Sequence, residues 1–116
     1  MLKREHLYKE ISGIDFNEER LIISFIDNTG IVVRDSMQQC CEERYMTTDD
    51  NLSDFIGSNL LYVGVRDVIK QSEKGGGWDD IQFLLVTTTI GIFTIESHNE
   101  HNGYYAGFNI TIGELQ

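Results

Sequence analysis

Short apolar runs rich in β-branched residues dominate this chain, and glycine, asparagine and aspartate separate them instead of proline. Proline is absent from all 116 residues, so the turns depend on 11 glycines and on Asn and Asp. Residues 20–45 read "RLIISFID", "NTG" and "IVVRDSMQQCCEERY", which is typical of a hairpin that turns at the NTG sequence. The pattern favours antiparallel strands joined by short turns.

The second half of the chain continues this pattern. "NLLYVGVRDVIKQ" and "IQFLLVTTT" are predicted strands joined by "SEKGGGWDD", whose glycines predict a mobile tip. "GIFTIES" and "GYYAGFNITI" are predicted to be two further strands, and the "SHNEHNG" sequence between them is predicted to be a hairpin loop.

One segment has helix signals. In "TTDDNLSDFIG", hydroxyl and carboxylate caps precede apolar residues at helical spacing, and Gly57 is a stop signal. A second short helix is expected at the first residues. The predicted class is therefore α+β: one domain over residues 1–116, with a mostly antiparallel curved β-sheet and one or two short helices.

The charge is strongly acidic, with Lys+Arg 9 against Asp+Glu 19 and a formal net charge of -10. Such a charge repels nucleic acid and membrane surfaces and favours basic partners, although it also serves solubility alone. No apolar run approaches the roughly 18 residues of a membrane-spanning helix, and "MLKREHLYKE" lacks the apolar segment of a signal peptide. The sequence predicts a cytoplasmic protein.

Two histidines and two cysteines suggest a metal site. His98 and His101 lie three residues apart, and Cys40 is adjacent to Cys41. Two thiolates and two imidazoles form a set of four ligands of the type that structural zinc prefers. The hypothesis is a zinc site made by Cys40, Cys41, His98 and His101.

Alternatives to this set remain open. Adjacent cysteines can share one metal only where the backbone is bulged, and a cysteine can instead be a small buried apolar residue. If only one cysteine reaches the ion, a carboxylate of Glu42, Asp49 or Asp50 could replace the other. His6 is expected to be exposed to solvent.

Two blocks carry a resemblance to a known family: "CCEERYMTTDDNLSDFIG" and "FLLVTTTIGIFTIESHNEHNGYYAGF". They resemble the signature blocks of a small family of phage- and prophage-encoded domains of unknown function. The chain is also similar to an acidic, zinc-containing anti-CRISPR protein of type II-A systems. The resemblance implies a non-enzymatic phage protein of the host bacterial cytoplasm that binds the RNA-guided DNA nuclease and blocks DNA loading or cleavage.

Acidic clusters are the candidate contacts with such a partner, because the nuclease holds its nucleic acid in positively charged channels. In this hypothesis the protein imitates DNA and makes no direct contact with nucleic acid. Trp78 is an additional candidate, since interface hot spots favour tryptophan. The predicted contact residues are Asp49, Asp50, Asp54, Trp78, Asp79 and Asp80, with Asp15, Glu18 and Glu19 as a further cluster.

Two other functions are compatible with the sequence. A small zinc-dependent hydrolase would use Glu100 or Glu42 as general base, although the HExxH spacing is absent. A phage protein that sequesters a nucleotide immune signal would use Tyr104 and Tyr105 with Arg66 or Arg44.

Overall fold

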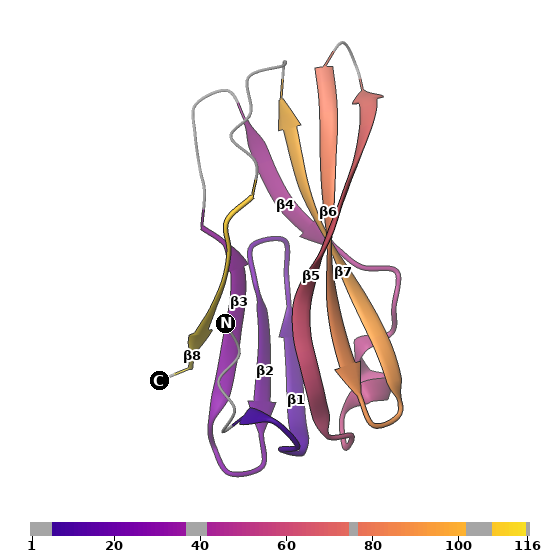
Figure 1. The fold of residues 1–116 in the computed structure, drawn as a ribbon. Coiled ribbons are helices and arrows are strands. Elements are labelled where there is room, and N and C mark those ends of the chain that lie inside the picture. Colours follow the sequence, from indigo (N-terminus) through magenta and orange to yellow (C-terminus); the bar gives the residue numbers. More distant parts are fainter. Residues whose placement is uncertain (1–5, 37–41, 75–76, 102–107, 116) are drawn as a thin grey trace.

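Residues 6–36, 42–74, 77–101 and 108–115 are described by the computed structural model, and they form two four-stranded antiparallel sheets (Figure 1). The first sheet has the strand order β1-β2-β3-β8, with β1 at Ile11–Phe16, β2 at Leu21–Phe25, β3 at Gly30–Asp35 and β8 at Ile110–Glu114. The second has the order β4-β7-β6-β5, with β4 at Glu43–Thr47, β7 at Gly91–His101, β6 at Gly77–Thr88 and β5 at Leu60–Lys74.

The predicted α+β class is wrong, because the expected helix is a single 3₁₀ turn, η2, at Leu52–Phe55. Asn51 makes no capping hydrogen bond through its side chain, and Ile56 already has extended dihedral angles. One turn is too short for propagation to offset the cost of helix nucleation. The apolar spacing instead lets Phe55 pack on Phe93, with ring centroids 5.0 Å apart.

No α-helix occurs in the described residues, and none of their helical segments could cross a membrane. The helix expected at the first residues falls on residues 1–5, outside the described part of the chain. The single curved sheet is also wrong, because the chain passes from the first sheet to the second after β3 and returns for β8.

The hairpin predicted around "NTG" is confirmed for β2 and β3. Leu21 pairs with Val33, and Asn28 has a φ of 68°, a left-handed conformation that Asn tolerates in tight turns. The predicted hairpin is too long, however. β3 ends at Asp35, and Glu43–Thr47 forms β4, which pairs with β7 in the other sheet.

The later strands are found where apolar residues predicted them, but with longer bounds. β6 begins at Gly77, so "WDD" lies inside a strand and not at a loop tip. β7 continues to His101, so the hairpin loop predicted from "SHNEHNG" is wrong for its first five residues. β8 pairs with β3, as in the Val33–Ile112 pair, and not with β7.

Both sheets bury one face. Along β7 the side chains alternate, so Phe93 and Ile95 are fully buried while Ile92 is exposed. The buried apolar residues are Ile11, Leu21, Ile23, Phe25, Ile31, Val33, Met46, Leu60, Val63, Leu84, Val86, Phe93 and Ile95. Figure 1 shows that β4 and the neighbouring ends of β6 and β7 extend past β1 and β2, and this end carries the polar residues described next.

Candidate functional site

His98 and His101 lie on opposite faces of the second sheet. Side chains alternate along a strand, so residues three apart point in opposite directions. The contacts agree, since His98 Nδ1 is 3.1 Å from an oxygen of Asp79 while His101 Nε2 is 3.1 Å from an oxygen of Asp80. As placed, the two imidazoles do not fit one metal ion.

The cysteines of the proposed zinc set, Cys40 and Cys41, lie outside the described residues. Among the residues that are described, no three His, Cys, Asp or Glu side chains are grouped to hold a metal. The four-ligand zinc site therefore stays a prediction that the histidine geometry does not favour.

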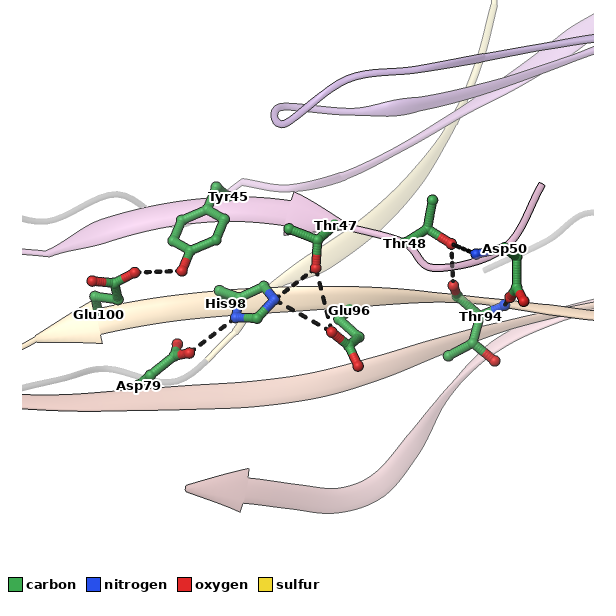
Figure 2. A network of polar contacts seen from close by, with 9 residues as sticks. All are labelled: Tyr45, Thr47, Thr48, Asp50, Asp79, Thr94, Glu96, His98 and Glu100. Carbon is green, nitrogen blue, oxygen red and sulfur yellow. Dashed lines mark hydrogen bonds and ion pairs between the residues drawn. The ribbon is translucent and has the colours of Figure 1, made fainter. Parts of the chain in front are cut away.

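His98 is the centre of a polar network on the outer face (Figure 2). The strand register places Tyr45 of β4 and Ile81 of β6 on either side of His98. The His98 ring bridges two elements: Nδ1 faces Asp79 of β6, and Nε2 lies 2.8 Å from the hydroxyl oxygen of Thr47 on β4. Glu96 Oε2 is 3.6 Å from the same nitrogen.

The ring of Tyr45 stacks on one face of the His98 imidazole and covers it. The ring of Tyr45 is nearly parallel to that of His98, with centroids 4.6 Å apart and an interplanar angle of 5°. Tyr45 donates its hydroxyl hydrogen to Glu100, which fixes the tyrosine over the imidazole. His98 is therefore buried although it lies on the outer face.

Asp79, His98 and Thr47 have the order of a carboxylate, imidazole and hydroxyl relay. Such a relay activates a hydroxyl for nucleophilic attack when the developing oxyanion is stabilised. Here the hydroxyl of Thr47 also lies 3.3 Å from Glu96 Oε2. A carboxylate at that distance opposes the negative charge of an attacking threonine, so the network favours a structural or binding role.

The inner face at this end of the sheet is polar and buried. Arg44 Nη1 donates to Asp35 Oδ2 at 2.7 Å, which joins β4 to β3 of the other sheet, and Arg44 Nε donates to Glu42. Asn99 pairs in register with both Arg44 and Asp80. The side-chain amide of Asn99 is fully buried and has no hydrogen-bond partner in the part of the chain that the structure describes.

The predicted partner contacts divide into exposed and buried residues. Asp49 and Asp54 are exposed, and Trp78 is 40% exposed. Asp79 and Asp80 are buried against the two histidines, so the expectation that this pair lies on an exposed loop is wrong. The reason is that β6 starts before them, so both lie in a central strand, where their side chains contact His98 and His101 of the neighbouring β7.

Asp50 is exposed but structural, because its Oδ2 accepts the backbone N–H of Thr94 at 2.8 Å (Figure 2). Thr48 donates to the carbonyl of Thr94 at the same distance. These bonds hold the segment after β4 against β7.

The remaining candidates are placed as follows. Tyr104 and Tyr105 lie outside the described residues. Glu42 is engaged by Arg44, and Glu100 by Tyr45, so both proposed general bases have partners.

His6 is buried at 3% exposure and stacks on Phe25, so its expected solvent exposure is wrong. Tyr45, Thr47 and Glu96 belong to the His98 network and were missed. Tyr45 and Thr47 reach His98 only through the register of β4 against β7. Glu96 lies two residues before His98 on β7, so the alternation of a strand, had it been extended through this segment, would have placed the two on one face.

Comparison with known proteins gives one match. Residues 4–110 match the family model described as Domain of unknown function (DUF7448). Neither the curated proteins nor the solved structures contain a match to this chain.

Proposed function

Because the chain belongs to the DUF7448 family, whose description assigns no function, we propose one from its own charge and geometry. The protein is a non-enzymatic binding protein that places an acidic surface on a basic surface of a protein partner. The specific partner is the RNA-guided DNA nuclease of a type II-A CRISPR system, bound in the host bacterial cytoplasm so that DNA loading or cleavage is blocked. This partner and the phage origin follow from the resemblance carried by residues 40–57 and 83–108.

The observation that carries the proposal is the placement of charge. Three cationic side chains are each paired with a carboxylate of the same chain, namely Lys9 with Asp27, Arg20 with Asp15 and Arg44 with Asp35. The exposed acidic side chains outside these pairs include Glu10, Glu18, Glu19, Glu43, Asp49, Asp50 and Asp54. The excess negative charge of the chain is thus displayed on the surface, where it can steer a basic partner.

Most of these residues surround β4, an edge strand of the second sheet. The turn that carries Glu18 is held to β4, because Met46 donates its N–H to the carbonyl of Glu18 at 2.8 Å. We call this region the β4 acidic surface and define it as Glu18, Glu19, Glu43, Asp49 and Asp50. It supports docking against a positively charged channel of the kind that holds the guide and target strands.

The zinc site is not part of this proposal, since His98 and His101 diverge. Sequestration of a nucleotide through Arg44 is also disfavoured, because that guanidinium is buried in ion pairs with Asp35 and Glu42. Hydrolysis is disfavoured by Glu96 beside the hydroxyl of Thr47.

The test is binding of the purified protein to the purified nuclease, with and without guide RNA, followed by DNA cleavage. The double variant Glu18→Gln, Glu43→Gln removes two charges from the β4 acidic surface, and about tenfold weaker binding is expected. Glu10→Gln is the matched control, since Glu10 is exposed but lies beside β1, and its affinity should change less than about twofold. No binding of the wild type, or equal losses in both variants, contradicts the proposal.

A further inference from the structure

An apolar groove runs along β5, the second edge strand of the second sheet. It encloses about 340 Å³ and lies between the start of β5 and the inner face of β8. Its lining is Leu7, Leu61, Tyr62, Val63, Gly64, Val65, Leu84, Ile110 and Ile112. A groove of this volume and composition is in the range of protein ligand sites.

The groove follows the backbone edge of β5 and not one face of the strand. Successive side chains of a strand point to opposite faces, yet residues 61–65 line the groove without interruption. Ile110 and Ile112, which are two residues apart on β8, supply the opposite wall. Because β5 is an edge strand, part of its main-chain N–H and C=O groups point away from β6, where an added strand could bind them, and the groove supplies apolar side chains beside that edge.

The first position of this edge already shows strand pairing. Leu60 donates its N–H to the carbonyl of Lys9 at 3.0 Å and accepts the N–H of Tyr8, and Glu10 forms an antiparallel bridge with Asn59. For residues 61–65, the described strands supply only β6 as a partner. Within the described residues, the edge is thus paired at its beginning, and along the groove no described strand besides β6 pairs with it.

We propose that the β5 groove binds an extended segment of a protein partner, which adds a strand to β5 and inserts alternate apolar side chains between the sheets. Strand addition to an open sheet edge combines main-chain hydrogen bonds with side-chain pockets in this way. The groove lining itself is uncharged, so charge selects the segment only through the net charge of the chain, -10, which attracts a segment whose outward side chains are basic. The same charge disfavours a second copy of this chain as the occupant.

The β5 groove uses other residues than the β4 acidic surface, so either proposal can fail without the other.

The probe is a short synthetic peptide in which lysine and valine alternate, and it is titrated into ¹⁵N-labelled protein. Amide shift changes are expected for residues 61–65 and 110–112. A peptide with serine in place of valine has the same charge and should bind at least about tenfold more weakly, as expected for the loss of buried valine side chains.

Val65→Glu should weaken binding of the lysine–valine peptide by about tenfold, since it puts a carboxylate in the groove. Ile92→Glu is the matched control, because Ile92 is an exposed strand residue outside the groove and gains the same charge.

A lysine–valine peptide with alternate N-methylated amides tests the main-chain bonds without altering the protein, and it should also bind weakly. Three outcomes would overturn the proposal. All the peptides could bind equally, the amide shift changes could be centred on the acidic loops, or the protein could form a dimer through residues 61–65 without peptide.

Discussion

Asp27 shows how single residues in this protein set a local charge balance. Its carboxylate accepts hydrogen bonds from the side chain and backbone N–H of Thr29, and it lies 2.9 Å from Lys9 Nζ. The side-chain hydrogen bond of Thr29, followed by that of Lys9, holds the pKa of Asp27 well below its usual range. The ionised carboxylate therefore stabilises the turn between β2 and β3.

The pH dependence of this contribution has a definite sign. Because the pKa of Asp27 is lowered on folding, its stabilising effect is complete above the ordinary aspartate pKa of about 4 and is lost progressively below it. Asp27→Asn should lower the melting temperature at pH 7, and the difference from wild type should shrink at pH 3. Asp49→Asn, at an exposed aspartate outside this turn, is the control; a difference for Asp27→Asn that is constant with pH would contradict the account.

At the scale of elements, one buried ion pair connects the two sheets. Asp35 ends β3 and Arg44 lies in β4, and their side chains are only 8% and 4% exposed. Arg44 also pairs with the buried carboxylate of Glu42, so removing Arg44 takes the cation away from two buried carboxylates, which costs about 3–5 kcal/mol.

Arg44→Met should lower the free energy of unfolding by about that amount in chemical denaturation. Combined Arg44→Met and Asp35→Leu should recover part of it, because one of the two carboxylates that lost the guanidinium is then removed and only Glu42 remains. If the double variant is as unstable as the single one, Glu42 and not Asp35 is the carboxylate that depends on Arg44.

The sequence predicted most of the strands, although not β1, and it predicted their partners poorly. Alternating and β-branched residues located β2, β3 and β5–β8, and "NTG" located the one hairpin turn that has a strong local signal. The bounds of β7 and the placement of β4 depend on pairing between distant segments, which periodicity does not encode. For the same reason His98 was found as a candidate, but Tyr45 and Thr47 beside it were not.

At the scale of the whole molecule, the surface charge predicts kinetics. If the β4 acidic surface steers association, the on-rate for the nuclease should fall markedly between about 50 and 500 mM salt, because the screening length shortens several-fold. The off-rate should change much less. Stopped-flow measurements of both rates check this, with Glu18→Gln, Glu43→Gln expected to show a shallower salt dependence; an on-rate that is independent of salt would exclude steering.

The return of β8 to the first sheet has a consequence for how the chain reaches its native state. The pair of Asp35 and Ile110 closes a loop that contains all of β4–β7, and β3 lacks its second neighbour until that loop closes. Closing a loop of that length costs entropy before any new contact compensates for it. Folding should therefore be slow for a domain of this size, in the millisecond-to-second range typical of all-β sandwiches. Until that step, the exposed edge of β3 is the segment most prone to intermolecular association.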